Sequence, residues 1–324
     1  MVVYTKGDEN LWTGRIDDTE KRAHFRNFQV VDVVDLEEID DNRENEQIED
    51  YAPQYDVGIL GYAVDRGVYL NQGRIGAQQG PDAIREKFGN MALMNDITIG
   101  DFGNISTDET YVENVQIEYA DMIKKSHSLA KFHMLLGGGH DISYAHYKGL
   151  RQIYPHQSIG VINIDAHFDL RDAKYATSGT GFKQIIDEDP EAGYLVLGIQ
   201  QAANTQHLFN IAKERGVEYV LAEQIDQDST NECIASFIDK YDVIMLTLCL
   251  DVIDSAYGPG VSAPCSFGLS PKQVYRLILE VLKYDKTQHI SIAEMNPEYD
   301  IDGRTAKMVG HIMFHILHRN SNIE

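Results

Sequence analysis

The residues of this chain that are best suited to chemistry follow a short apolar segment. Asp165, His167 and Asp169 alternate directly after the apolar run Ile159–Ile164. Alternate residues of an extended segment point to the same side, so two carboxylates and an imidazole would be directed at one point. Burying two like charges together would be very costly without a cation between them. The spacing therefore indicates a metal site.

Three other apolar runs end in residues of the same kinds. They are followed by Gly137-Gly138-Gly139-His140-Asp141, by Cys249-Leu250-Asp251 and by Glu294. Taken alone, the glycine run is typical of a turn and His140 of a core histidine, but Cys249 and Asp251 repeat the alternate spacing. Carboxylate and imidazole ligands with a shared carboxylate suit Mn²⁺ or a similar divalent ion. We expect two ions about 4 Å apart that hold and ionise a water between them.

The elements that must position these residues are predicted by hydrophobic pattern. The apolar runs are Val57–Gly61, His133–Leu136, Ile159–Ile164, Tyr194–Gly198, Tyr219–Leu221, Val243–Leu248 and His289–Ala293. Amphipathic segments, with apolar residues three and four apart, are Val112–Lys131, Gln206–Arg215, Ser270–Leu282 and Arg304–Leu317. The alternation predicts an α/β fold: a three-layer, doubly wound, mainly parallel sheet with helices on both faces. Ligands of such sheets bind beyond the carboxyl ends of the strands, where the residues above stand.

Composition narrows the class of protein. The chain has 324 residues, of which 43% are hydrophobic and 24% charged, as in globular proteins. Its 28 Lys and Arg against 51 Asp and Glu give a net charge of −23, which repels phosphate backbones and anionic lipid. We therefore expect neither nucleic acid nor membrane as a partner.

The predicted organisation is one domain over residues 1–324, with 1–54 as an N-terminal arm and acidic loop. The acidic run Asp35–Asp50 has no sustained apolar period, so it is expected to be a solvated loop or a short surface helix. Three cysteines without metal-finger spacing indicate a reducing compartment, and the chain shows neither an apolar leader nor a spanning segment. A cytoplasmic protein is expected.

Four motifs together resemble the ureohydrolase family, which comprises the dimanganese arginases, agmatinases and formimidoylglutamases. The motifs are Gly137-Gly-Gly-His140-Asp141, Asp165-Ala-His167-Phe-Asp169, Asp251-Val-Ile-Asp254 and Glu294-Met-Asn-Pro297. Their order and spacing match over residues 55 to 318. Gly73–Arg85 is similar to the family's glycine-rich motif, and Leu11–Arg15, Ser255–Pro264 and Asp302–Lys307 resemble formimidoylglutamases most closely.

The resemblance implies an arginase fold, a ring-like homo-oligomer and two Mn²⁺ per subunit. It places His140, Asp165, Asp169 and Cys249 around one ion, and Asp165, His167, Cys249 and Asp251 around the other. It further implies hydrolysis of N-formimidoyl-L-glutamate to L-glutamate and formamide, a step of histidine degradation. Glu294 matches the carboxylate that holds the cationic amidinium, and we expect Asp169 to accept a proton from the bridging water.

The two carboxylates of such a substrate require cations from a strongly acidic protein. Arg171 is the first candidate because its planar fork suits a carboxylate, and Lys183 is the second. Hydroxyls of Ser178 and Thr180 could add hydrogen bonds, although Arg171 and Lys183 are equally compatible with ordinary surface cations. Arginases have a histidine involved in proton transfer at the position of Phe182, which argues against that activity.

Cys249 departs from the family pattern, which has a bridging aspartate there. A thiolate is softer than a carboxylate and prefers Zn²⁺ or Fe²⁺ to Mn²⁺, so the second metal is expected to be held loosely. A working dimetal site with a thiolate ligand, an inactive relative and a structural thiol remain open alternatives. The competing functions are an agmatinase or other guanidino-acid hydrolase, and a metal-poor scaffold or regulator. A nucleotide-binding protein is disfavoured because Gly137–Gly139 lack the dinucleotide spacing.

Overall fold

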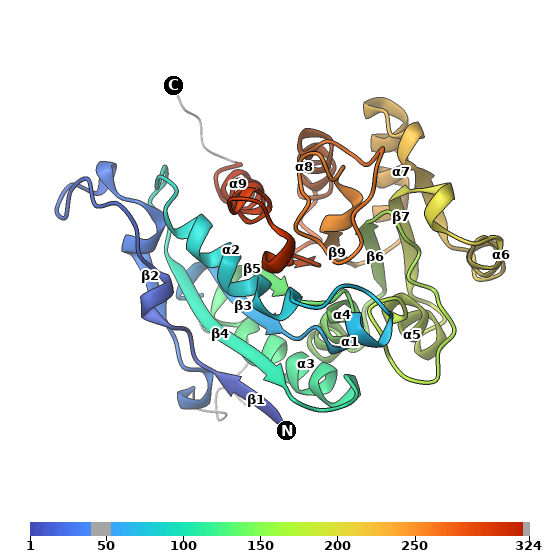
Figure 1. The fold of residues 1–324 in the computed structure, drawn as a ribbon, viewed down its shortest axis with the longest axis horizontal. Helices are drawn as coiled ribbons and strands as arrows, with labels where there is room; N and C mark the ends of the chain where they lie inside the picture. The colour runs from blue at the N-terminus through green and yellow to red at the C-terminus, as the bar shows by residue number, and fades with distance from the viewer. Residues whose placement is uncertain (40–52, 320–324) are drawn as a thin grey trace.

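The computed structural model describes residues 1–39 and 53–319, and in them ten strands form one sheet between two layers of helices (Figure 1). The strands are β1 (Val2–Thr5), β2 (Val31–Val33), β3 (Tyr55–Ala63), β4 (Ile99–Thr107), β5 (Ala130–Gly137), β6 (Ile159–Ile164), β7 (Gly193–Ile199), β8 (Glu218–Leu221), β9 (Val243–Cys249) and β10 (His289–Ala293). Their order is β1-β4-β3-β5-β10-β9-β6-β7-β8, with β2 beside β4, and all neighbours are parallel except β1 and β4.

The helices divide between the two faces of the sheet. They are α1 (Arg66–Leu70), α2 (Gly80–Gly89), α3 (Glu113–His127), α4 (Ile142–Ile153), α5 (Gly181–Glu188), α6 (Gln206–Glu214), α7 (Gln227–Ile238), α8 (Pro271–Val281) and α9 (Arg304–Leu317). One core cluster joins α2, α7, α8 and α9 to one face, and two others join α3, α4, α5 and α6 to the opposite face. The predicted three-layer fold is thereby confirmed.

Side-chain alternation explains why the strands are apolar throughout. In β3, Val57 and Ile59 lie in the core beneath α2 and α9, whereas Leu60 and Tyr62 lie in the core beneath α3. Successive residues of a strand point to opposite faces, so a strand covered on both faces needs apolar residues at nearly every position. All seven predicted runs lie within observed strands, and the four amphipathic segments contain α3, α6, α8 and α9.

The N-terminal segment contributes two strands to the sheet. Its β1 pairs with β4 in antiparallel register and its β2 pairs with β4 in parallel register. Of the acidic run, residues 36–38 form a short 3-10 turn, and residues 40–50 lie outside the described part of the chain. No helix in the described residues is long and apolar enough to cross a membrane.

A buried polar group fixes this segment to α2 and β4. Asp101 of β4 accepts hydrogen bonds from Arg85 Nε at 3.1 Å and Nη2 at 2.8 Å, and its other oxygen accepts one from Trp12 Nε1 at 2.8 Å. Asp101 is fully buried and the Arg85 side chain is only 1% exposed. Trp12, which belongs to the motif Leu11–Arg15, therefore helps to satisfy the buried charge of Asp101.

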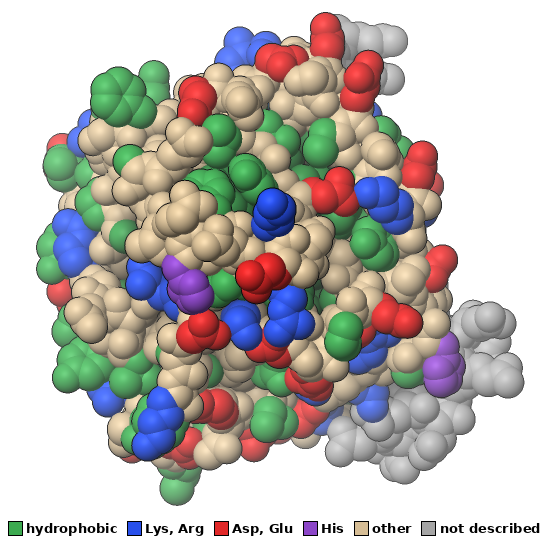
Figure 2. Space-filling model, turned by 90° about the vertical axis from the view of Figure 1, so that its right-hand side faces the viewer, with side chains coloured by type: hydrophobic (Ala, Val, Ile, Leu, Met, Phe, Trp, Pro, Cys, Tyr) green, Lys and Arg blue, Asp and Glu red, His purple; other side chains and the backbone are tan. Residues whose placement is uncertain are grey.

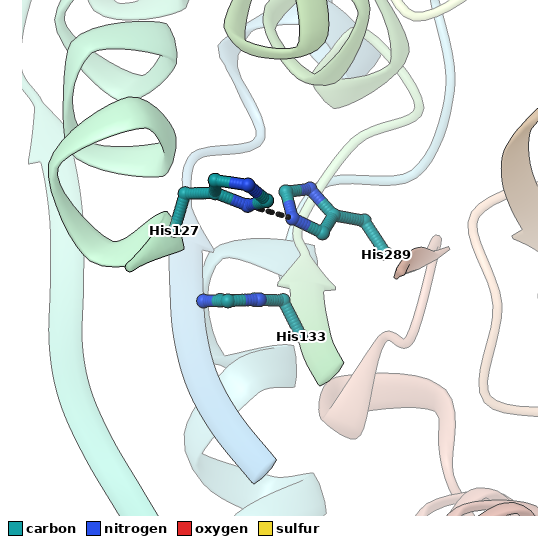
Figure 3. Close-up of side chains that lie close together, drawn as sticks. All are labelled: His127, His133 and His289. Atoms are coloured by element: carbon teal, nitrogen blue, oxygen red, sulfur yellow. Dashed lines mark hydrogen bonds between the residues drawn. The ribbon is translucent and has the colours of Figure 1, made fainter. Parts of the chain in front are cut away.

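His127, His133 and His289 form a cluster of three histidines (Figure 3), and His289 begins β10, at the opposite end of the strand from Glu294. His127 Nδ1 and His289 Nε2 are 3.1 Å apart in a hydrogen bond, and His133 Nε2 is 3.0 Å from the carbonyl oxygen of Ser126. The rings of His127 and His133 are nearly parallel, at 28°, with centroids 6.0 Å apart. An imidazole binds a metal through a lone pair in its ring plane, so stacked rings do not converge on one ion.

These histidines are electrically neutral. Burial lowers the pKa of His127 to about 4 and that of His133 to about 3. The cluster therefore packs as uncharged rings within the core at neutral pH.

Candidate active site

The candidate ligands meet because four neighbouring strands end side by side. Strands β5, β10, β9 and β6 are consecutive in the sheet and all parallel. Cys249, the last residue of β9, is in register with Ala293, so it lies beside the residue that precedes Glu294. In the same way Leu248 is in register with Ile164, the residue before Asp165. Cys249 thus becomes a neighbour of Ala293, and Leu248 of Ile164, although the members of each pair are far apart in the chain.

Two groups of donor atoms share one carboxylate. The ligand atoms of His140, Asp165 and Cys249 all lie within 4.8 Å of one another, and so do those of Asp165, His167 and Asp251. His140 Nδ1 is 3.0 Å from Asp165 Oδ2 and 3.1 Å from Asp169 Oδ2. His167 Nδ1 is 3.2 Å from Asp251 Oδ2. The structure therefore brings together the six residues predicted as metal ligands.

The rings and carboxylates of this group are held from behind. His140 Nε2 lies 3.0 Å from Thr247 Oγ1, and its ring packs edge-on against Phe182 with centroids 5.2 Å apart. A second contact of this kind fixes the orientation of a ligating imidazole. Asp165 Oδ1 accepts a hydrogen bond of 2.7 Å from the backbone N–H of His167.

The electrostatics of the group fit a divalent cation. Burial opposes charge on His140, yet hydrogen bonds to Asp165 and Asp169 raise its pKa well above 6.5. Burial likewise opposes charge on His167, and Asp251 and Asp165 raise its pKa well above 6.5. Protons on the two imidazoles thus balance the negative charge of the carboxylates, as a bound divalent cation would. Asp251 Oδ1 is buried without a hydrogen-bond partner, which leaves it available as a ligand.

Glu294 lies beside this group and is fixed in place. Its Oε1 accepts a 2.7 Å hydrogen bond from the backbone N–H of His140, and its own N–H donates to Gly138 O. The side chain is 4% exposed, and burial together with Asp251 raises its pKa to about 8. Asp169 and Glu294 have positive φ angles of 49° and 73°, a strained conformation for non-glycine residues that is often found at functional sites.

The glycine run between β5 and α4 permits close backbone approach. A Cβ on Gly138 would lie 2.0 Å from Val64 O, and the N–H of Gly138 donates to Tyr62 O. No side chain fits in that space, so the glycine lets the end of β5 contact the end of β3. This contact sets the position from which His140 reaches the other ligands.

A cavity of about 250 Å³ opens above the ligands. Its walls include His140, His167, Asp169, Cys249, Asp251 and Glu294, together with Asn71, Gln72, Arg74, Arg171, Ser178, Asn204 and Ser262. Asn71, Arg74 and Asn204 were not expected from the sequence. The signal in the sequence was the glycine-rich motif Gly73–Arg85, which contains Arg74 and which Asn71 precedes by two positions.

Two of the four predicted substrate-binding residues line this cavity. Arg171 is held by its backbone N–H, which donates to Gly179 O at 3.0 Å, and its guanidinium has no partner among the described residues. Ser178 Oγ accepts a 3.1 Å hydrogen bond from Asn71 Nδ2.

Thr180 and Lys183 lie outside the cavity walls. Thr180 is buried in a turn, where its hydroxyl donates to Thr177 O. Lys183 forms ion pairs with Asp187 and Asp172. Figure 2 shows the side of the molecule that carries α5 and α6, where acidic and basic side chains are interspersed rather than gathered in one patch.

The fold and the paired histidine–carboxylate groups define an α/β protein with two groups of side chains that could hold metal ions, and the chain belongs to the arginase family, whose model matches residues 55–318. The resemblance inferred from the motifs is confirmed. A formimidoylglutamase from Macrococcus caseolyticus (strain JCSC5402) is 66% identical over 321 residues, which is 99% of this chain and 100% of the relative.

Two solved structures share the fold. Formimidoylglutamase from Bacillus subtilis has a TM-score of 0.74 at 22% identity, over 83% of this chain and 88% of its own. Trypanosoma cruzi formiminoglutamase with Mn²⁺ has a TM-score of 0.72 at 21% identity, over 84% of this chain and 94% of its own. These likenesses confirm the architecture.

Proposed function

We propose that this protein hydrolyses N-formimidoyl-L-glutamate to L-glutamate and formamide, as a step of histidine degradation. The observation that carries the proposal is the pair of histidine–carboxylate groups that share Asp165 at the base of a cavity with Glu294. The name and 66% identity of the Macrococcus relative support the choice of substrate. The proposal includes the cytoplasmic homo-oligomer expected from the sequence.

The proposed cofactor is Mn²⁺, with two ions per subunit. His140, Asp165, Asp169 and Cys249 would hold one ion, and Asp165, His167, Cys249 and Asp251 the other. When bound, such ions acidify a water and supply hydroxide at neutral pH. The Mn²⁺ named with the Trypanosoma structure supports this choice of metal.

Glu294 and Asp169 have the proposed catalytic roles. Glu294 accepts hydrogen bonds from the cationic amidinium and is held beside the candidate ligands by the N–H of His140. Burial raises the pKa of this carboxyl group to about 8, and the positive charge of the amidinium favours its ionised form. The water oxygen bonds to the formimidoyl carbon, the bond from that carbon to the glutamate nitrogen breaks, and the nitrogen gains a proton. Asp169 accepts the proton of the water and returns it to the leaving amine.

The glutamate end would lie towards Arg171 and Ser178. The free guanidinium of Arg171 offers a planar fork for a carboxylate, and the Ser178 hydroxyl adds a donor. Thr180 supports the turn that carries Ser178, and Lys183 is assigned no contact because Asp187 and Asp172 already pair with it.

The test measures formamide and urea release by the purified protein, with and without Mn²⁺, alongside its metal content. Formamide from formimidoylglutamate, increased by Mn²⁺, is the expected result. Urea from agmatine or another guanidino compound would replace the proposed activity with that of a guanidine hydrolase. No turnover with any divalent ion and no retained metal would favour a scaffold or regulator.

A further inference from the structure

The cavity walls contain two permanently cationic side chains among the described residues, Arg74 and Arg171. The substrate proposed above has two carboxylates, one on the α-carbon and one at the end of the side chain. Arg171 can bind only one of them without strain, since a single guanidinium fork matches a single carboxylate. The second carboxylate therefore needs another cation, and Arg74 is the one present.

Arg74 is held in position by neutral partners. Its Nε and Nη2 donate to the carbonyl oxygens of Ser262 and Val261, and its guanidinium carbon lies 3.9 Å from the centre of the Tyr299 ring. Among the described residues, the hydrogen bonds of the Arg74 guanidinium go to these two carbonyl oxygens, and it forms no ion pair with a carboxylate. The side chain is thus immobilised, but its charge is not neutralised, although the protein has 51 acidic residues.

The backbone of Arg74 is also tied to the strand end that carries Glu294. Asn296 Nδ2 donates to Arg74 O at 3.0 Å and to Ile75 O at 2.9 Å. Arg74 therefore has a fixed position relative to the carboxylate proposed to bind the amidinium. A preorganised cation loses little conformational freedom when an anion binds, so it can distinguish substrates by charge.

We infer that Arg74 binds one carboxylate of the substrate while Arg171 binds the other, so that the pair selects dicarboxylate amidines. This inference rests on the proposed function. Arg74 supplies the fixed contact, and the exposed side chain of Arg171 adjusts to the ligand. The alternative is that Arg74 only ties the loop at residues 71–74 to residues 261–262.

Ligand binding tests this inference without requiring turnover. L-Glutamate, the proposed product, is titrated calorimetrically into Mn²⁺-loaded protein, in parallel with L-glutamine and 4-aminobutyrate, which each lack one carboxylate. Arg74→Gln and Arg171→Gln should each weaken L-glutamate binding by about 10- to 150-fold, the range for hydrogen bonds to charged groups. For the ligand that lacks the carboxylate bound by the replaced arginine, each variant should lose less than about 3-fold in affinity.

The control is Arg304→Gln, which removes another arginine bonded to a backbone carbonyl, that of Ala256, outside the cavity walls. It should leave all three affinities unchanged. If Arg74→Gln does not fold, Arg74→Lys takes its place. This variant keeps the charge but loses the planar fork, so it should show the same ligand pattern with a smaller loss of affinity.

Equal losses for all three ligands in the Arg74 variants, or no loss, would overturn the inference in favour of a structural tie. If the selective pattern appears but formimidoylglutamate is not hydrolysed, the inference holds and the proposed function fails. If formimidoylglutamate is hydrolysed but the selective pattern is absent, the proposed function holds and the inference fails.

Discussion

Replacing Cys249 with aspartate is expected to tighten Mn²⁺ binding. The thiol is 2% exposed, and burial together with Asp165, Asp251 and Glu294 raises its pKa well above the ordinary value of 9.0. Because the thiolate is the form that binds metal, the thiol must lose its proton first. Aspartate avoids this requirement and is also the harder ligand, which suits Mn²⁺.

The size of the effect follows from the proton. Even at an ordinary pKa of 9.0, deprotonation at pH 7 costs two pKa units, which is about 2.7 kcal/mol or about 100-fold in affinity. Burial adds to this cost, so a gain of about 100-fold or more is expected from the proton alone. Compared with the variant, the wild-type affinity for Mn²⁺ should also rise by about one further factor of ten per pH unit, because its thiol releases one additional proton on binding.

The assay combines Mn²⁺ content after dialysis against a chelator with calorimetric titration between pH 6.5 and 8.5. Cys233→Asp is the control, since Cys233 is half-buried in α7 and belongs to neither donor group. Equal metal retention and equal pH slopes in wild type and Cys249→Asp would refute the assignment of Cys249 as a ligand.

Three further predictions concern the proposed catalytic group Glu294 and the buried residues His133 and Arg85. Glu294→Gln should lower kcat/KM by about 10²- to 10³-fold with Mn²⁺ content unchanged, and loss of metal instead would contradict the proposed role. The pKa of His133 is about 3 in the folded state and 6.5 when unfolded, so the unfolded state binds more protons and stability falls as pH falls from 6.5 towards 3. Urea midpoints should show this decline weakened by His133→Gln and unaltered by replacement of the exposed His156, and an unchanged slope in the first variant would count against it. Arg85→Leu leaves Asp101 buried without its guanidinium and should lower the free energy of unfolding by about 3–5 kcal/mol in urea titrations; a loss below about 1 kcal/mol would show that Asp101 becomes protonated or solvated.

The group of candidate metal ligands was predictable from the sequence because strands buried on both faces are continuous runs of apolar residues. Once those runs are assigned to a parallel sheet, the residues after them must share one edge. His140, Asp165 and Cys249 needed no further information. Strand β4 was not predicted because Asp101 and Asn104 interrupt its apolar pattern, and their partner Arg85 comes from α2.

The cavity walls were less predictable because tertiary contacts create them. Asn71 and Arg74 lie in a loop without periodicity, and only contacts with Ser178 and Ser262 place them at the site. Lys183 was expected at the substrate, but Asp187 stands four residues later in the same helix and pairs with it. That i,i+4 spacing was visible in the sequence and favoured a surface ion pair.

The position of β10 in the sheet has a consequence for how the protein is made. Strands β1 to β5 lie on one side of β10, and strands β6 to β9 lie on the other. Strand β10 pairs with β5 on one side and with β9 on the other, so it joins the two halves of the sheet. During synthesis from the N-terminus, the strand pairing that joins the two half-sheets can form only after residues 289–293 have left the ribosome. His140 and Cys249 follow strands of different halves, so a chain that lacks β10 is expected to have an incomplete group of candidate ligands. Assembly of the centre should therefore be among the last events of folding, when the most distant contacts form.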